Sequence, residues 1–143
     1  MKGMLTLVVT GGRDYHDRSL VRLTLDQMRV GCKRMLLVTG ACPTGADEFA
    51  RQWAFGLKDV EYEGVPADWD KYGRAAGPMR NRTMLEEYRP HFVVAFPGNR
   101  GTKSCINIAK ELGLQVVLPA WDQSTKDKRL LLMYLPKSRV DRG

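Results

Sequence analysis

The chain has 143 residues, the usual length of one domain, and can bury a hydrophobic core without disulfide bonds or metal ions. Charged residues make up 27% and hydrophobic residues 43%, and no apolar run approaches the ~18 residues of a membrane span, which excludes disordered, fibrous and membrane-spanning chains. The 23 Lys and Arg residues exceed the 16 Asp and Glu residues, and the resulting charge of +7 favours an anionic partner such as a nucleotide, a phosphate ester or nucleic acid.

Cysteine usage and the N-terminus predict the cellular setting. Cys32, Cys42 and Cys105 are an odd number without Cys-x-x-Cys spacing, which argues against a disulfide framework and against a zinc cluster. We therefore expect neither a metal ion nor a cofactor. The segment Met1–Leu5 lacks the apolar core and cleavage site of a signal peptide, so we expect a reduced, cytoplasmic protein without a membrane partner.

Short apolar runs alternate with amphipathic segments along the chain. The apolar runs predict strands over residues 5–10, 35–39, 60–65, 91–96 and 114–118. Helical spacing predicts helices from a cap at Asp17 to Gly31, around residues 49–57, from Gly77 to about Tyr88, and over residues 102–112. Between the third strand and third helix, residues 66–76 are expected to form a loop with a short helical turn.

This alternation predicts an α/β fold: a mainly parallel five-stranded sheet with helices on both faces, in one Rossmann-like domain over residues 1–120. The favoured strand order is 3-2-1-4-5, which makes strands one and four neighbours at the topological switch point, where ligands bind beyond the carboxyl ends of strands. Residues 121–143 form a basic extension, and its apolar run Leu130–Leu135 is either an added edge strand or an oligomer contact.

Glycine-rich loops follow three of the predicted strands: Gly11-Gly12-Arg13 after the first, residues 40–47 after the second, and Pro97–Thr102 after the fourth. Glycine lets backbone N–H groups approach an anion, and a following helix N-terminus adds favourable partial charge. The pattern Gly98-x-x-Gly101-Thr102 before a helix therefore suits a phosphate. The alternative is that strand–helix turns need glycine in any case.

Charged residues near the same edge are further candidates. Arg80, Asn81 and Arg82 lie in the first turn after Gly77-Pro78, where cations oppose the helix dipole and a bound anion would compensate; the alternative is solvated arginines. Asp47 lies three residues after Thr44, a spacing that favours helix capping but also places a carboxylate where it could meet a ribose hydroxyl.

Acidic and aromatic side chains complete the candidate set. Cleavage of an N-glycosidic bond would need a carboxylate, for which the loops offer Asp14, Asp68 and Asp70, with Asp68 as the first catalytic candidate. Trp69 and Tyr72 either stack on a base or anchor their loop in the core. Cys105 is expected to be a small buried helix residue rather than a nucleophile paired with His16.

Taken in order, these segments resemble the YspA/cpYpsA-related branch of the SLOG superfamily. The resemblance covers about residues 4–118 and rests on Thr10–Asp14, Gly45-Ala46-Asp47, Ala67-Asp68-Trp69 with Tyr72-Gly73-Arg74, Gly77–Asn81, and Val94–Thr102. It implies a Rossmann-like fold and a nucleotide or nucleotide-derived ligand. The superfamily includes the LOG phosphoribohydrolases and the DNA-processing protein DprA, and the LOG likeness implies a dimer.

The chain departs from the LOG pattern at two positions, one of which is the terminal glutamate. LOG enzymes carry Pro-Gly-Gly-x-Gly-Thr-x-x-Glu, in which Pro97, Gly98, Gly101 and Thr102 match, Asn99 stands in the third place and Cys105 replaces the glutamate. The Met-x-x-Arg motif of LOG enzymes matches Met79 to Arg82. The resemblance thus implies that phosphate binding is kept, while the missing carboxylate argues against LOG-type hydrolysis.

The leading hypothesis is therefore a homo-oligomeric sensor or sequestering protein for a nucleotide-derived phosphorylated ligand. The alternatives are an N-glycosidic hydrolase or transferase acting on nucleotides, and a single-strand nucleic-acid binder. The residues expected to bind the ligand are Gly11, Gly12, Arg13, Gly45, Asp47, Arg80, Asn81, Arg82, Pro97, Gly98, Asn99, Gly101 and Thr102.

Overall fold

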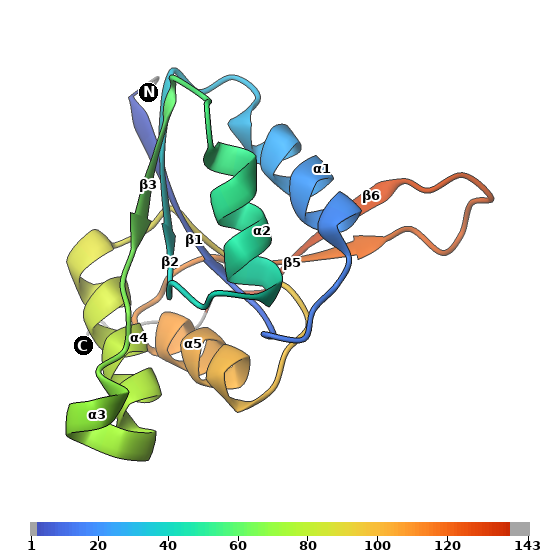
Figure 1. Cartoon of the computed structure of the whole chain (residues 1–143). Coiled ribbons are helices and arrows are strands. Elements are labelled where there is room, and N and C mark those ends of the chain that lie inside the picture. Colours follow the sequence, from blue (N-terminus) through green and yellow to red (C-terminus); the bar gives the residue numbers. More distant parts are fainter. Residues whose placement is uncertain (1–2, 138–143) are drawn as a thin grey trace, which may run out of the picture.

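The computed structural model describes residues 3–137. Its sheet has six strands: β1 (Met4–Thr10), β2 (Arg34–Thr39), β3 (Val60–Gly64), β4 (Phe92–Ala95), β5 (Val116–Trp121) and β6 (Leu130–Tyr134). The order is β3-β2-β1-β4-β5-β6, and the first five strands are parallel (Figure 1). The predicted fold and the order 3-2-1-4-5 are confirmed. The strand count is six because the apolar run after residue 129 adds β6, antiparallel to β5.

The helices are α1 (Arg18–Arg29), α2 (Gly45–Ala54), α3 (Trp69–Tyr72), α4 (Ala76–Tyr88) and α5 (Arg100–Glu111), with a 3₁₀ turn η1 (Gly73–Ala75) between α3 and α4. The predicted cap of α1 is confirmed, because the Asp17 carboxylate accepts the Leu20 backbone N–H at 3.1 Å. Helix α4 begins at Ala76, one residue earlier than predicted, because α3 and η1 lead directly into it.

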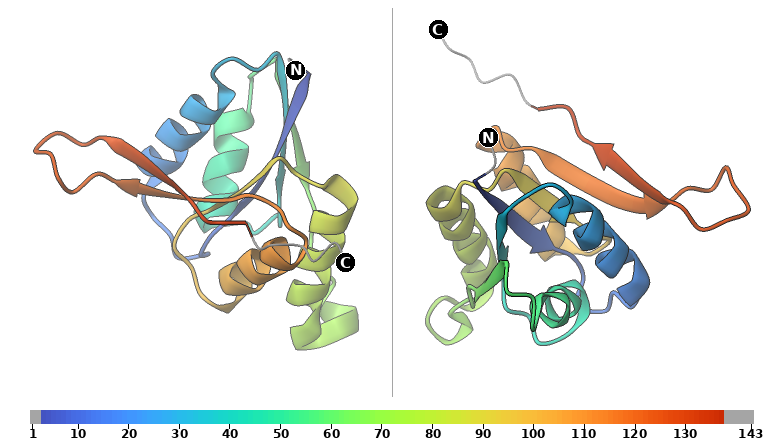
Figure 2. Two further views of the ribbon diagram at one scale, coloured as in Figure 1. Left: turned by 180° about the vertical axis from the view of Figure 1, so that it is seen from behind. Right: turned by 90° about the horizontal axis from the view of Figure 1, so that it is seen from above.

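Two hydrophobic layers sandwich the sheet, because alternate residues of β1 point to opposite faces. Leu7 and Val9 pack with α1 and α2 on one face, whereas Val8 packs with α4 and α5 on the other. Figure 2 shows these two helix pairs on opposite sides of the sheet. Right-handed crossovers explain the division, since the chain winds outward from β1 in one direction to β3 and then returns to β4.

The β5–β6 hairpin projects from the body beyond α1 (Figures 1 and 2). Trp121, the last residue of β5, lies at the loop end of the hairpin and donates its ring N–H to the Asp17 carboxylate at 2.7 Å. Leu131, Met133 and Tyr134 of β6 are exposed. Among residues 3–137 no helix is both long and apolar enough to cross a bilayer.

Candidate functional site

A cavity of about 250 Å³ opens at the carboxyl ends of β1 and β2, where the first turns of α4 and α5 also meet. We call it the carboxyl-edge cavity. Nine of the thirteen predicted ligand-binding residues line it: Gly11, Gly12, Arg13, Asp47, Arg80, Asn81, Asn99, Gly101 and Thr102. The cavity therefore lies at the predicted topological switch point, with a side chain or backbone segment from each predicted glycine loop.

The loops after β1 and β4 are in direct contact. The Gly12 N–H donates to the Pro97 carbonyl at 2.8 Å. A Cβ atom added at Gly98 would lie 2.7 Å from the Gly12 nitrogen and would overlap the Thr102 hydroxyl. Gly98 and Pro97 therefore do not line the cavity themselves but let the two loops approach closely enough to form its wall.

The loop after β2 is joined to the same wall. Gly45 has a φ of +72°, and a Cβ atom there would overlap the Gly12 carbonyl oxygen. That carbonyl accepts the Ala46 N–H at 3.3 Å, and the Thr44 hydroxyl donates to the Arg13 carbonyl at 2.9 Å. Gly45 is thus buried beneath the cavity as a packing residue, and it presents the start of α2 to the ligand edge.

The first turn of α5 supplies the anion-binding feature of the cavity. The helix begins at Arg100 after Asn99, whose side chain makes no capping hydrogen bond among the described residues. The unpaired N–H groups of a helix start carry partial positive charge and attract anions. Gly101 faces open space, since an added Cβ atom there would meet no atom of the described residues within 4 Å outside its chain neighbours and its own helix backbone. No side chain at Gly101 therefore stands between this helix start and the cavity that it lines.

Arg80 and Asn81 hold the walls of the cavity together. The Arg80 guanidinium donates to the Gly40 carbonyl at 2.6 Å, to the Val65 carbonyl at 3.1 Å and to the Asn81 side-chain oxygen at 2.8 Å. The buried Asn81 amide in turn donates to the Gly101 carbonyl at 3.2 Å. These bonds connect the loops after β2 and β3 to α4 and α5, so both residues have a structural task in addition to facing the cavity.

Asp47 is the buried carboxylate of the cavity, with 8% of its surface exposed. Burial raises the pKa of Asp47 to about 6, against the opposing effects of the Cys42 backbone N–H, which donates to the carboxylate at 3.1 Å, and of nearby Arg80. The predicted capping role is wrong: no side chain caps α2, and the Thr44 hydroxyl bonds to Arg13 instead. Asp47 thus lines the cavity as a carboxylate that already accepts one backbone hydrogen bond.

Several other predicted residues do not lie at the cavity. The Arg82 guanidinium donates to Glu111 at 2.6 Å and lies 3.6 Å from Glu86, on the outer side of α4. Asp68 is exposed and caps α3 by accepting the Lys71 N–H at 3.1 Å. The structure therefore gives the first catalytic candidate a local structural role and leaves Asp14 and Asp47 as the carboxylates that line the cavity.

Trp69 and Cys105 each had a functional and a structural interpretation in the sequence. The Trp69 ring lines the cavity, is 50% exposed and lies over Gly77, where an added Cβ atom would approach it to 3.1 Å. Cys105 is fully buried, and burial raises the pKa of its thiol to about 12, so the expectation of a small buried helix residue is confirmed. His16, the other member of the alternative nucleophile pair, is exposed.

Sequence reasoning missed Val9 and Met84 of the lining, and it placed Gly40 and Cys42 in a glycine-rich loop at this edge without naming them as ligand-binding residues. Gly40 follows β2 as Gly11 follows β1, and a Cβ atom there would lie 2.6 Å from the Arg80 guanidinium carbon. No group of three or more His, Cys, Asp or Glu side chains within residues 3–137 is placed to hold a metal ion.

Comparisons with known proteins assign this chain to a family. Residues 5–72 match the model of the YspA, cpYpsA-related SLOG family (YAcAr). The chain is 31% identical over 121 residues to the Gene 61 protein of Mycobacterium phage D29, an alignment that covers 80% of this chain and 95% of that protein.

Among solved structures, a UDP-N-acetylglucosamine 2-epimerase has a TM-score of 0.50 at 13% identity, covering 87% of this chain and 36% of the enzyme. The Neisseria meningitidis UDP-GlcNAc 2-epimerase bound to UDP-GlcNAc has a TM-score of 0.47 at 15% identity. This alignment covers 80% of the present chain and 32% of the enzyme. The chain spans about a third of these enzymes, and the first likeness shows a shared Rossmann-like fold alone. By the family match and the phage relative, the chain belongs to the YspA, cpYpsA-related SLOG family.

Proposed function

We propose that this chain is a cytoplasmic protein that binds a nucleotide or nucleotide-derived phosphorylated ligand in the carboxyl-edge cavity, as a sensor or sequestering protein. One observation carries the proposal: the cavity joins an open helix start, at Gly101, to a buried carboxylate, Asp47, and to a half-exposed aromatic ring, Trp69. A nucleotide offers three matching groups, namely a phosphate, ribose hydroxyls and a planar base.

Each group has a complementary place in the cavity. The phosphate accepts hydrogen bonds from backbone N–H groups at the start of α5, and Arg13 supplies charge from the loop after β1. The Asp47 carboxylate accepts hydrogen bonds from ribose hydroxyls at the start of α2. The base stacks on Trp69. The SLOG family and the Rossmann-like neighbours are consistent with a nucleotide-related ligand.

Calorimetry with a panel of nucleotides, together with mass spectrometry of small molecules that co-purify with the protein, tests this proposal. We expect saturable binding that is lost in Gly101→Val, because the valine side chain enters space that the phosphate needs. The variant is expected to fold normally, since the added Cβ atom meets none of the described residues within 4 Å outside its chain neighbours and its own helix backbone. Equal affinity of the parent and Gly101→Val would contradict phosphate binding at the start of α5.

A second candidate function is cleavage of the N-glycosidic bond of a nucleotide. The observation that favours it is the ionisable Asp47 within the cavity, since a carboxylate with a pKa of about 6 can exchange protons near neutral pH. Release of free base from the nucleotide panel, abolished in Asp47→Asn, supports this function. Binding without any release of base supports the sensor or sequestering role.

We further propose that residues 1–120 form the ligand-binding domain and that residues 121–143 are an extension through which two copies associate. The exposed apolar side chains of β6, among them Leu131 and Met133, support this contact. Light scattering is expected to give twice the chain mass, and Leu131→Lys to give a monomer. A mass near 16.2 kDa for the parent at all micromolar concentrations would contradict the dimer.

A further inference from the structure

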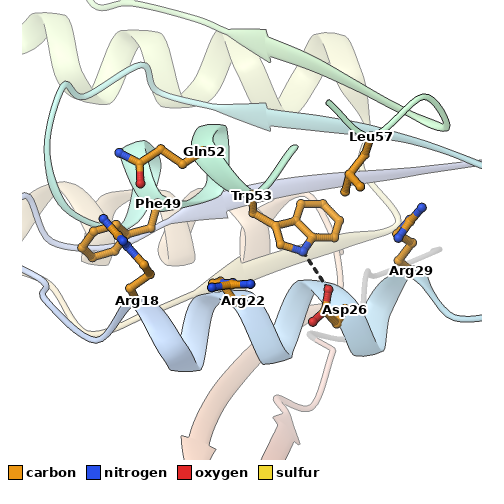
Figure 3. A pocket seen from close by; sticks show the side chains of 8 residues that line it. All are labelled: Arg18, Arg22, Asp26, Arg29, Phe49, Gln52, Trp53 and Leu57. Atoms are coloured by element: carbon orange, nitrogen blue, oxygen red, sulfur yellow. Dashed lines mark hydrogen bonds between the residues drawn. The ribbon is translucent and has the colours of Figure 1, made fainter. Parts of the chain in front are cut away.

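A second hollow, of about 340 Å³, lies between α1 and α2 on the outer side of their layer. We call it the α1–α2 groove. It shares no lining residue with the carboxyl-edge cavity and has no part in the function proposed above. Figure 3 shows its aromatic rings, Phe49 and Trp53, reaching down from α2 toward the arginines of α1.

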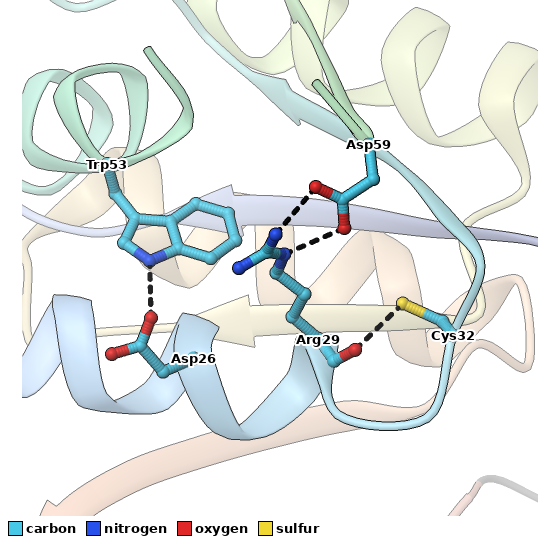
Figure 4. A network of polar contacts seen from close by, with 5 residues as sticks. All are labelled: Asp26, Arg29, Cys32, Trp53 and Asp59. Atoms are coloured by element: carbon cyan, nitrogen blue, oxygen red, sulfur yellow. Dashed lines mark hydrogen bonds and ion pairs between the residues drawn. The ribbon is translucent and has the colours of Figure 1, made fainter. Parts of the chain in front are cut away.

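The aromatic wall of the groove is held in place. Phe49 and Trp53 are four residues apart in α2, so they lie on the same side of the helix, and both pack partly against the core. The Trp53 ring N–H donates to the Asp26 carboxylate at 2.8 Å (Figures 3 and 4). This bond fixes the orientation of the indole and engages the one carboxylate that lines the groove.

The cationic wall contains two guanidinium groups without a carboxylate partner. Arg18 and Arg22 lie one turn apart on α1, and within residues 3–137 neither forms an ion pair, in contrast to Arg29. The Arg29 guanidinium is neutralised by Asp59 through bonds of 2.8 and 2.6 Å (Figure 4). The Arg18 guanidinium lies 5.3 Å from the centre of the Phe49 ring, which holds the charge beside an aromatic surface.

We propose that the α1–α2 groove binds a nucleotide unit, with its planar base against Trp53 and its phosphate at Arg22 and at Arg18, which lies over the Phe49 ring. A planar ring and an adjacent anionic group match the two walls together, and base stacking on aromatic side chains combined with arginine contacts is a general mode of binding nucleotides without sequence preference. The unit comes either from a free nucleotide or from single-stranded nucleic acid. An acidic peptide would use the arginines and leave the rings unused.

The three tryptophans of the chain allow a direct test, because each reports on a different region. Trp53 lies in the groove, Trp69 in the carboxyl-edge cavity and Trp121 at the loop end of the β5–β6 hairpin. Their indole N–H resonances, assigned with single Trp→Phe variants, are followed by NMR while the full chain is titrated with AMP, with a single-stranded oligothymidylate or with a short polyglutamate peptide.

We expect the Trp53 resonance to shift saturably with AMP, with the oligothymidylate or with both, and these two arms identify the source of the nucleotide unit. Arg22→Gln is expected to weaken the response about tenfold, since it removes a charge-assisted hydrogen bond. Arg51→Gln is the matched control: it removes the same charge from α2, but Arg51 pairs with Glu48 and does not line the groove.

Three results would overturn the proposal: an unmoved Trp53 resonance at millimolar AMP and oligonucleotide, an equal response in Arg22→Gln and the parent, or an equal response to polyglutamate. Circular dichroism of Arg22→Gln confirms that the variant is folded. Because Trp69 is observed in the same spectra, failure of the groove and failure of the carboxyl-edge cavity are recognised separately.

Discussion

The carboxyl-edge cavity and the α1–α2 groove differ in what forms their walls. Backbone loops and buried polar side chains form the cavity, and Gly98, Gly45 and Arg80 bring those loops together. Exposed side chains from two helices form much of the groove, and Arg18 and Arg22 form no ion pair within residues 3–137. Substitutions of the residues that join the cavity loops are therefore expected to affect stability and binding together, whereas substitutions of groove cations are expected to affect binding alone.

The largest effect is expected from Gly98→Val. The added side chain collides with the Gly12 backbone and with Thr102, so the loops after β1 and β4 must separate. We expect a loss of about 3 kcal/mol or more in the free energy of unfolding, measured with urea. Gly101→Ala is the matched control and is expected to retain the stability of the parent. Equal stability of both variants would show that the two loops do not need their close approach.

The next effect concerns Asp47→Asn and depends on pH. The folded-state pKa of Asp47, about 6, lies above its ordinary value of 3.8, so the folded protein binds more protons than the unfolded chain between these values. The free energy of unfolding therefore falls as pH rises from about 4 to about 6. We expect Asp47→Asn to be more stable than the parent by roughly 2–3 kcal/mol at pH 7, and by little at pH 4.

Urea unfolding of the two proteins at both pH values measures this difference. Asp70→Asn serves as the control, because Asp70 is exposed and lies outside the cavity lining. A loss of stability in Asp47→Asn at pH 7 would mean that the ionised carboxylate stabilises the fold, contrary to the burial that raises its pKa.

A smaller effect separates Arg13, which lines the cavity, from Arg82, which was predicted to bind the ligand but lies away from it. Arg13→Ala is expected to weaken nucleotide binding about tenfold, since it removes a charge-assisted hydrogen bond to the phosphate. Arg82→Ala is expected to change the affinity by less than about twofold, because exposed ion pairs to Glu111 and Glu86 contribute little and lie away from the cavity. Calorimetry with the tightest-binding nucleotide compares them, and the reverse order of effects would place the phosphate beside Arg82.

The smallest effect is expected for the stability of Arg22→Gln. Arg22 is exposed and forms no ion pair among the described residues, so its substitution is expected to change the free energy of unfolding by less than about 0.5 kcal/mol. Thermal and urea unfolding measure this change. A loss of more than about 1 kcal/mol would mean that the groove cations support the α1–α2 contact, and the contrast between the two regions would disappear.

Sequence reasoning succeeded where local patterns determine the structure. Apolar runs, glycine stops and the Asp17 cap predicted the strands and helices. Their alternation with right-handed crossovers predicted the strand order, which places the loops after β1 and β4 side by side. It failed where the direction of a side chain depends on its exact position around a helix. Arg80 and Arg82 lie two positions apart in α4, so they point to nearly opposite sides of the helix, and only Arg80 faces the cavity.

Tertiary contacts account for the remaining differences. The Thr44-x-x-Asp47 spacing predicted a cap, but close packing of Gly45 on the β1 loop directs the Thr44 hydroxyl to Arg13. The arginines of α1 and the aromatic residues of α2 belong to separate helical patterns in the sequence. Their meeting in a groove depends on how the two helices pack, which no local pattern specifies.

The most direct measurement of the central claim follows the Trp69 indole resonance during titration with AMP, GMP, CMP and UMP. The proposal predicts a saturable shift with at least one nucleotide in the parent and no shift in Gly101→Val, because the added side chain occupies the place of the phosphate. A Trp69 resonance that responds to none of the four nucleotides, or that responds equally in Gly101→Val, would contradict nucleotide binding at the carboxyl-edge cavity.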